Sequence, residues 1–128
     1  MVRADQSACL IDFDSAILPG STPALGRFIG TYSYAPPEQI RGEIVDGRAD
    51  IYAMGTLLYR MLCGRRPFEA ETTEALIDQQ LYSRPRLLDA QVPDIPERIV
   101  TLIMSMLEKE PEHRPQSAKA VAQMLRQA

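Results

Sequence analysis

The sequence predicts a mainly α-helical domain that begins with one short β element. Three segments repeat apolar residues at helical spacing, over residues 50–62, 96–107 and 118–125. A shorter apolar run over residues 8–11 has the length of a buried strand. With 128 residues, of which 45% are hydrophobic and 24% charged, the chain has room for one domain with a single core.

Charge and cysteine content exclude several classes of function. The formal net charge is −3 and the isoelectric point is about 5.1, so no basic surface for a nucleic-acid backbone is expected. Cys9 and Cys63 lie far apart in apolar runs, which predicts buried thiols instead of a zinc site or a disulfide framework. No signal peptide is evident, and the apolar run over 51–63 is too short to span a membrane. We expect a cytoplasmic protein that binds neither nucleic acid nor membrane.

The first forty residues predict a strand, a long loop and one helical turn. The strand over 8–11 runs into Asp12-Phe13-Asp14, which places carboxylates at its C-terminal end. Residues 15–34 are rich in Gly, Ser, Thr and Pro and show no helical or strand period. A loop of this length in a compact domain is usually functional or mobile. Pro36-Pro37-Glu38 then begins a helical turn, because proline fits the first positions of a helix.

Four helices are expected in the rest of the chain. The strongest signal runs from Asp50 to Leu62 and leaves almost no polar stripe, so this helix should be buried nearly all round, with Gly64 as its C-cap. A more polar helix is expected over 73–81 and an amphipathic one over 96–107. Ser117 is a plausible N-cap for the last helix. The apolar face of that last helix consists of Ala118, Val121, Ala122 and Leu125.

Five short motifs follow one another along the chain. They are Leu10-Ile11-Asp12-Phe13-Asp14, the segment from Gly30 to Glu38, Asp50-Ile51-Tyr52-Ala53-Met54-Gly55, Gly64-Arg65-Arg66-Pro67-Phe68, and the segment from Leu107 to Pro115. In this order they resemble the metal-binding D-F-G motif, the end of the activation segment, the buried central helix, the turn after it and the late Arg-Pro segment of eukaryotic-type (Hanks-type) Ser/Thr protein kinases. The style of the motifs is that of bacterial members, and the resemblance spans nearly the whole chain.

The resemblance implies a fold, a reaction and cofactors. The implied fold is a kinase C-terminal lobe, in which a central buried helix is joined by about three further helices. Residues 8–40 would form the metal-binding strand end and the activation segment, and residues 41–128 the helical lobe. Intact relatives transfer the γ-phosphoryl group of ATP to a Ser or Thr hydroxyl of a protein substrate, with the help of Mg²⁺.

The same resemblance assigns roles to residues of the activation segment. Asp12 is expected to bind Mg²⁺ and, through it, the nucleotide phosphates. Asp14 stands where the family has glycine, so its carboxylate either adds a metal ligand or repels ATP. The implied substrate-docking residues are Gly30 and Thr31, and the candidate phosphorylation sites are Ser21 and Thr22.

Three further residues have structural roles by resemblance. Glu38 and Arg114 match a buried ion pair that ties the activation segment to the lobe, and the planar guanidinium of Arg can bind a carboxylate through two hydrogen bonds. Asp50 suits the positive end of its helix, and in intact relatives this residue also holds the backbone of the catalytic loop.

Parts of the kinase machinery are missing from the sequence. No His-Arg-Asp motif and no Gly-rich phosphate loop occur in it. We therefore expect a truncated kinase domain that is inactive alone. The half that is missing should leave an apolar stripe uncovered on the central helix, which favours self-association or binding to a complementary N-terminal fragment. That stripe should include some of Ile51, Met54, Leu58 and Leu62.

Two other interpretations stay open. An apolar strand followed by Asp-x-Asp is also typical of haloacid-dehalogenase-type phosphotransferases, in which Asp12 would be the nucleophile and Asp14 the acid or base. A non-catalytic pseudokinase or interaction module is the other alternative. A calcium loop is excluded, because counting from Asp12 places Ile17 and Pro23 where the loop requires Gly and Glu.

Overall fold

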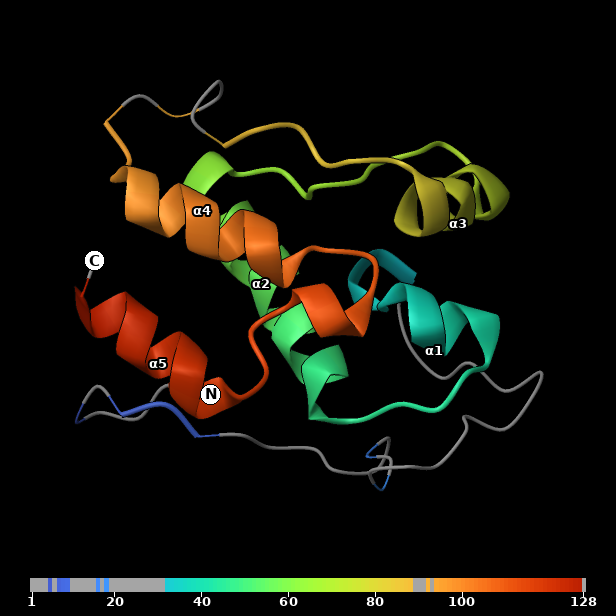
Figure 1. Ribbon diagram of the computed structural model, residues 1–128. Coiled ribbons are helices and arrows are strands. Elements are labelled where there is room, and N and C mark those ends of the chain that lie inside the picture. Colours follow the sequence, from blue (N-terminus) through green and yellow to red (C-terminus); the bar gives the residue numbers. More distant parts are fainter. Residues whose placement is uncertain are drawn as a thin grey trace.

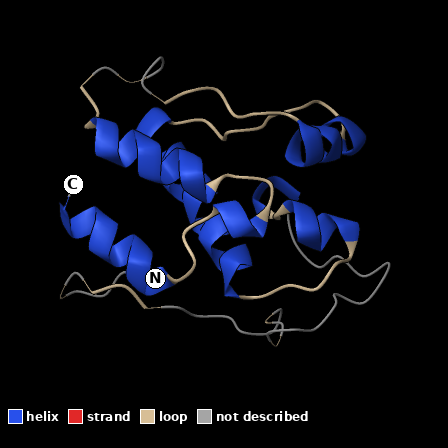
Figure 2. Cartoon of the chain, in the orientation of Figure 1, coloured by secondary structure: helices blue, strands red, loops and turns tan. Residues whose placement is uncertain are grey.

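The computed structural model describes residues 5, 7–9, 16, 18, 32–88, 92 and 94–127. Its elements are η1 (Tyr32–Tyr34), α1 (Pro37–Arg41), α2 (Gly47–Cys63), α3 (Thr73–Tyr82), α4 (Glu97–Met106), η2 (Pro111–His113) and α5 (Ala118–Gln127). The described residues form no strand, and only Ala8 and Val45 make isolated β-bridges (Figure 2). The predicted mainly α fold is confirmed, although Leu10 and Ile11 of the expected strand lie outside the described residues.

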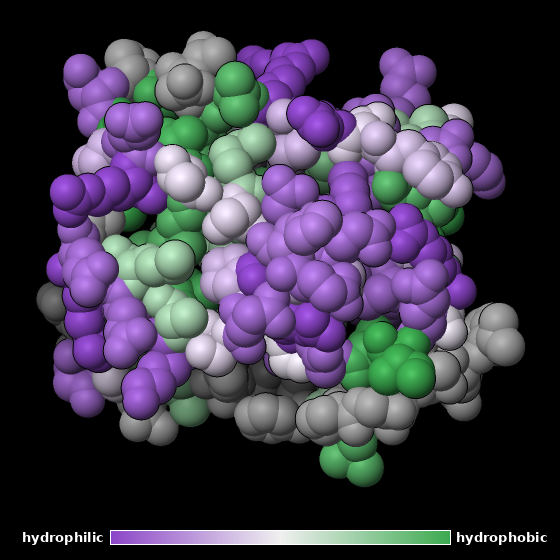
Figure 3. All heavy atoms as spheres, in the orientation of Figure 1, coloured by the Kyte–Doolittle hydropathy of each residue, from purple (hydrophilic) through white to green (hydrophobic). Residues whose placement is uncertain are grey.

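Helix α2 lies at the centre of the arrangement (Figure 1). It packs against α4, and α4 in turn contacts α5. At the other end of the lobe, α3 contacts both η1 and α1. On the face shown in Figure 3, hydrophilic side chains cover α1 and η2, whereas hydrophobic side chains are visible between α4 and α5. None of the described helices is long and apolar enough to cross a membrane.

The core consists of two apolar clusters that both join α2 to α4. The first contains Tyr52, Tyr59, Leu88, Ile103 and Leu107, and the second contains Ile51, Leu102, Met106 and Val121. Gly55 is what allows the two helices to approach closely. A Cβ atom at this position would lie 2.8 Å from the Cβ atom of Met106, which is closer than packed side chains tolerate.

The boundaries of α2 are set by two caps, of which the sequence predicted one. Gly64 has φ 72°, and its N–H donates to the carbonyl of Arg60, as expected for a left-handed C-cap. The start was expected at Asp50, but the helix begins three residues earlier at Gly47. Asp46 is the N-cap, since its carboxylate accepts a hydrogen bond from the Arg48 N–H at 2.9 Å.

The other helices follow the sequence signals closely. Helix α1 starts at Pro37, as the proline pair predicted. Thr72 caps α3, which extends one residue past its expected end, and α4 lies within its expected range. The hydroxyl of Ser117 accepts a hydrogen bond from the Ala120 N–H at 3.1 Å, so the predicted cap of α5 is confirmed.

One expectation about the burial of α2 was wrong. Helix α2 is not buried all round, because four large apolar side chains on it are exposed. They are Met54, Leu57, Met61 and Leu62, exposed by 41%, 48%, 70% and 39%, and we call them the exposed α2 face. Of the stripe anticipated from the sequence, Met54 and Leu62 are exposed, but Ile51 is buried and Leu58 half-buried.

The apolar face expected on α5 is mostly open as well. Val121 is buried, Ala122 is half-buried, and Ala118 and Leu125 are exposed. The physical reason is that α5 joins the core chiefly through Val121, which packs in one cluster with Ile51, Leu102 and Met106.

Candidate functional site

The segment from η1 to α1 is held tightly against the helical lobe. Ser33, Ala35 and the segment Pro36-Pro37-Glu38 are buried. Side chains from three parts of the lobe bond to η1, because Arg60 donates to the Tyr34 hydroxyl, Arg66 to the Ser33 hydroxyl and Gln80 to the Tyr32 carbonyl. The described end of the loop over 15–34 is therefore a fixed structure.

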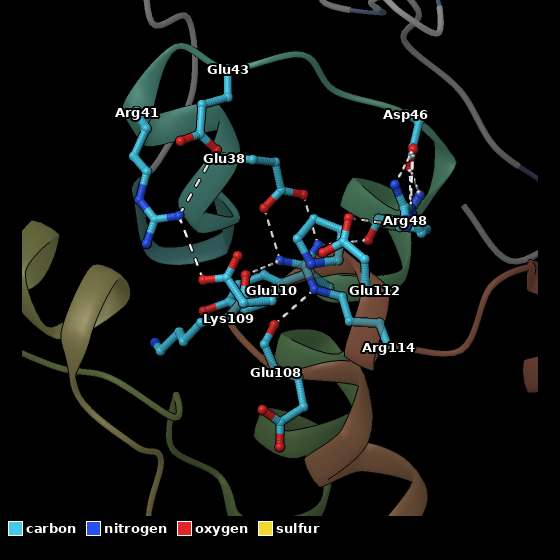
Figure 4. A network of polar contacts seen from close by, with 12 residues as sticks. Glu38, Arg41, Glu43, Asp46, Arg48, Glu108, Lys109, Glu110, Glu112 and Arg114 are labelled. Atoms are coloured by element: carbon cyan, nitrogen blue, oxygen red, sulfur yellow. Dashed lines mark hydrogen bonds and ion pairs between the residues drawn. The ribbon is translucent and has the colours of Figure 1, made fainter.

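Glu38 and Arg114 form a buried ion pair at the centre of this attachment (Figure 4). Nη1 of Arg114 lies 2.7 Å from Oε1 of Glu38, and Nη2 lies 2.8 Å from Oε2. The two side chains are exposed by only 0% and 4%. The structure thus brings together two residues that are far apart in the sequence, in the two-pronged geometry that a guanidinium offers and an ammonium group does not.

Arg114 does more than neutralise Glu38. Its Nε donates to the carbonyl of Glu108 at 2.8 Å, Nη1 to that of Arg48 at 3.1 Å and Nη2 to that of Lys109 at 2.8 Å. All five N–H groups of the guanidinium are therefore used. One side chain joins α1, the first turn of α2 and the loop after α4.

The ring of Tyr52 connects this ion pair to η1. The guanidinium carbon of Arg114 lies 4.9 Å from the ring centroid, and the buried Tyr52 hydroxyl donates to Oε1 of Gln80. Gln80 is fully buried and passes the connection on to Tyr32 through its amide nitrogen, 2.9 Å from the carbonyl oxygen. Burial raises the pKa of the Tyr52 phenol, with Arg114 acting in the opposite direction. Tyr52 is therefore a neutral donor at physiological pH.

Lys109 closes the network at the end of α3. Its Nζ donates to the carbonyls of Gln79 and Gln80 at 3.2 and 2.6 Å and lies 4.0 Å from the ring centroid of Phe68. Burial, followed by the positive charges of Arg114 and Arg41, lowers the pKa of this ammonium group to about 8. The cation sits at the negative end of the α3 dipole, where it adds a second donor to the Gln79 carbonyl, which also accepts from the Ser83 N–H at 3.0 Å.

Weaker charge pairs surround the network at the surface (Figure 4). Arg48 pairs with Asp46 at 2.7 Å, and Asp46 has a lowered pKa because it accepts the side-chain hydrogen bond of Arg48. Arg48 also lies 3.7 Å from Glu112, and Arg41 lies 3.8 Å from both Glu43 and Glu110. Exposed pairs of this kind add little to stability, so the buried Arg114 carries the attachment.

Asp50 lies in the first turn of α2 and points to a different part of the surface. It is exposed and lines a cavity of about 580 Å³ together with Met54, Gln116 and Ser117. Within the described part of the chain its carboxylate accepts no hydrogen bond, and the N-cap role belongs to Asp46. The cavity adjoins the exposed α2 face through Met54.

The remaining predicted site residues cannot be placed relative to this network. Asp12, Asp14, Ser21, Thr22, Gly30 and Thr31 lie outside the described residues. The described residues contain no cluster of three or more His, Cys, Asp or Glu side chains that would hold a metal ion.

Sequence reasoning missed Tyr52, Gln80 and Lys109 as parts of the attachment. Tyr52 was counted among the apolar residues of its helix, although a buried phenol needs a hydrogen-bond partner. That requirement was the available signal, because a buried tyrosine in an otherwise apolar stretch indicates that a hydrogen-bond partner lies next to it. No comparable signal marked Gln80 or Lys109, which lie in polar segments.

The helices around α2, with a loop end anchored by a buried Glu–Arg pair, define a helical lobe of the protein kinase type. The model of the protein kinase domain matches residues 1–125, and the chain belongs to this family. The family as a whole uses ATP and Mg²⁺ and acts on protein substrates.

Bacterial protein kinases are among the curated relatives. The serine/threonine-protein kinase pkn2 of Myxococcus xanthus is 36% identical over 127 residues, which cover 94% of this chain and 15% of the relative. The DNA damage-responsive serine/threonine-protein kinase RqkA of Deinococcus radiodurans is 36% identical over 121 residues, which cover 90% of this chain and 18% of the relative. The tyrosine-protein kinase MasK of Myxococcus xanthus is 38% identical over 96 residues, which cover 75% of this chain and 15% of the relative. The predicted relationship to bacterial Ser/Thr kinases is confirmed, and the chain spans less than a fifth of each of these relatives.

Proposed function

We propose that this chain supplies the C-terminal-lobe part of a Ser/Thr protein kinase, which transfers the γ-phosphoryl group of ATP to a Ser or Thr hydroxyl of a protein. The observation that carries the proposal is the buried Glu38–Arg114 pair, which anchors the segment from η1 to α1 to the helical lobe. Membership of the protein kinase family supports the reaction. We propose a cytoplasmic location as well, since the reaction consumes ATP.

The proposed nucleotide-binding residues belong to the first part of the chain. Two carboxylates, Asp12 and Asp14, form a donor set that suits Mg²⁺, which takes oxygen ligands from carboxylates and phosphates. When bound, Mg²⁺ neutralises charge on the phosphates. We assign Asp12 as the main ligand, while Asp14 replaces the family's glycine and either joins the site or weakens nucleotide binding. The proposed substrate-docking residues are Gly30 and Thr31, and the proposed phosphorylation sites are Ser21 and Thr22.

Residues beyond this sequence are required for the reaction. Phosphoryl transfer in this family depends on positioning by a catalytic-loop Asp, a metal-binding Asn and a phosphate-binding Lys. The sequence contains no His-Arg-Asp motif to supply the first of these. We therefore propose that the 128-residue chain alone does not transfer phosphate.

The exposed α2 face is the proposed docking surface for the preceding half of the kinase domain. Met54, Leu57 and Met61 are spaced by three and four residues, so they form one apolar stripe along the helix. The cavity lined by Asp50 continues this stripe through Met54 and adds a carboxylate without a partner among the described residues. Without its partner, the stripe is expected to drive self-association of the chain.

A kinase assay tests the reaction. The chain alone, incubated with radiolabelled ATP, Mg²⁺ and a generic basic protein, is expected to transfer no label. If the residues encoded upstream of Met1 carry His-Arg-Asp, a chain extended by them is expected to transfer label. The Asp12→Ala variant of that extended chain is expected to lose this activity. Transfer by the chain alone that Asp12→Ala abolishes would contradict the proposal.

Sedimentation with a hydrophobic dye tests the docking surface separately. The chain is expected to associate at micromolar concentration and to bind the dye, and Leu57→Glu with Met61→Glu should reduce both effects. Met124→Glu is the matched control, because Met124 is 49% exposed on α5 and lies outside the stripe. A monodisperse chain without dye binding would show that the stripe needs no partner.

A non-catalytic interaction module is the second candidate. The observation that favours it is Asp14, whose negative charge stands where the family places glycine next to the phosphates. Partner binding without nucleotide turnover by the extended chain would establish this alternative. A haloacid-dehalogenase-type reaction would instead form an Mg²⁺-dependent aspartyl phosphate at Asp12, but the parallel strands it needs do not occur among the described residues.

A further inference from the structure

Four arginines line one cavity between the loop after α2 and the segment after α3. The cavity has a volume of about 380 Å³, and its arginines are Arg65, Arg66, Arg84 and Arg86. Glu69 is the one carboxylate among the described residues that line it. A chain with a formal net charge of −3 therefore concentrates an excess of positive charge in one hollow.

The walls of this cavity are joined by hydrogen bonds. The side-chain amide of Gln79 donates to the carbonyl of Glu69 at 3.1 Å and accepts from the Glu69 N–H at 3.2 Å. The hydroxyl of Tyr59, a core residue exposed by 1%, donates to the carbonyl of Arg86 at 3.1 Å. The loop after α2, the end of α3 and the segment carrying Arg86 are thus fixed relative to one another, and the hollow is largely pre-formed.

The described residues leave most of the positive charge in the cavity without an ion-pair partner. Arg66 bonds the Ser33 hydroxyl, and the Glu69 carboxylate accepts from the Arg66 backbone N–H at 3.3 Å. Arg65, Arg84 and Arg86 are exposed and form no ion pair with any described residue. The arginines with ion pairs are elsewhere, at Arg41, Arg48 and Arg114. Unpaired like charges repel each other, and an anionic ligand removes this repulsion.

We propose that this cavity binds a phosphorylated segment of a protein. A phosphate monoester carries a charge of about −2 and three acceptor oxygens, and guanidinium groups bind such oxygens in pairs. Arginine clusters are a recurring means of recognising phosphorylated peptides. A carboxylate carries half the charge and one fewer oxygen, so it satisfies fewer of these donors. The polar, concave lining suits a side chain that enters the hollow better than a flat lipid surface.

Calorimetric titration of the chain with synthetic peptides tests the proposal. The probes are one phosphoserine peptide and the same peptide with Ser or Glu in place of phosphoserine. At low salt, the phosphopeptide is expected to bind at least about tenfold tighter than either, and inorganic phosphate is expected to compete. Arg84→Gln with Arg86→Gln should weaken phosphopeptide binding at least about tenfold. The experiment contains no ATP, so its result is independent of the proposed kinase reaction.

The matched control is the double variant Arg98→Gln and Arg126→Gln. Both arginines lie on helices away from the cavity, and the change in net charge is the same. This control is expected to bind the phosphopeptide like the unmodified chain, and circular dichroism verifies that all variants keep their helices. Equal weakening by both double variants would show attraction by overall charge and overturn the proposal. Binding to phosphatidylserine vesicles without binding to the phosphopeptide would overturn it as well, in favour of a membrane surface.

Discussion

Removal of the Arg114 guanidinium is expected to destabilise the lobe strongly. Breaking a buried ion pair by removing one partner costs about 3–5 kcal/mol. In Arg114→Ala the Glu38 carboxylate loses two hydrogen bonds, and the carbonyls of Arg48, Glu108 and Lys109 lose one each. We therefore expect the upper end of the range, about 5 kcal/mol. A typical domain is stable by about 5–15 kcal/mol, so this variant is expected to lie near the limit of folding.

Two companion variants separate the ion pair from its surroundings. Glu38→Gln keeps an acceptor beside the guanidinium and leaves its three bonds to carbonyls intact, so the expected loss is smaller, about 2–3 kcal/mol. Replacing both Glu38 and Arg114 by Leu removes both buried charges together. That double variant is expected to be more stable than Arg114→Ala, because no charge is left without a partner.

Urea unfolding followed by circular dichroism at pH 7 measures these differences. Arg126→Ala serves as the control, since Arg126 is exposed near the end of α5. Where Arg114→Ala does not fold, Glu38→Gln remains measurable and tests the same pair. The argument from burial would be refuted if Glu38→Gln and Arg114→Ala each lowered the free energy of unfolding by less than about 0.5 kcal/mol, as the control is expected to do.

Three further predictions concern the packing around α2 and α3. Burial lowers the pKa of Lys109 to about 8 from 10.5, so the unfolded chain binds this proton more tightly and the free energy of unfolding should rise between pH 8 and 10. Urea unfolding at several pH values should show this rise in Lys119→Met but not in Lys109→Met. Gly55→Ala should lower the melting temperature, because the new Cβ meets Met106 at 2.8 Å, and an unchanged melting temperature would mean that α2 and α4 separate freely. Ser117→Ala should lower the free energy of unfolding in urea by about 1 kcal/mol, whereas Ser117→Asp should keep the cap and the stability of the unmodified chain.

Helix positions were accessible from the sequence because local signals specify them. Apolar spacing located α2 and α4, while Gly64 and Ser117 marked a helix end and a helix start with residues whose chemistry suits those positions. The early start of α2 was missed for a related reason. Asp46 is a good N-cap, but two residues without apolar character follow it, so the periodic signal begins only later.

Burial and the polar network required three-dimensional information. The sequence of α2 is apolar nearly all round, and periodicity alone does not say which side of such a helix meets a neighbour. The partners of Tyr52 come from α3 and from the loop after α4, at separations that no local pattern encodes. The pairing of Glu38 with Arg114 was anticipated only through resemblance to a family, since both residues are ordinary charged residues by composition.

The two sides of α2 have different requirements, and this difference indicates how the lobe works. Tyr52, Gly55, Thr56 and Tyr59 share one side of the helix and are buried. On that side the network around Arg114 is complete, because no buried polar side-chain atom of the described residues lacks a partner. Met54, Leu57 and Met61 lie on the opposite side, where these large apolar side chains are exposed. The lobe therefore holds the segment from η1 to α1 with its own residues, while the opposite side of α2 is left for the docking role proposed above.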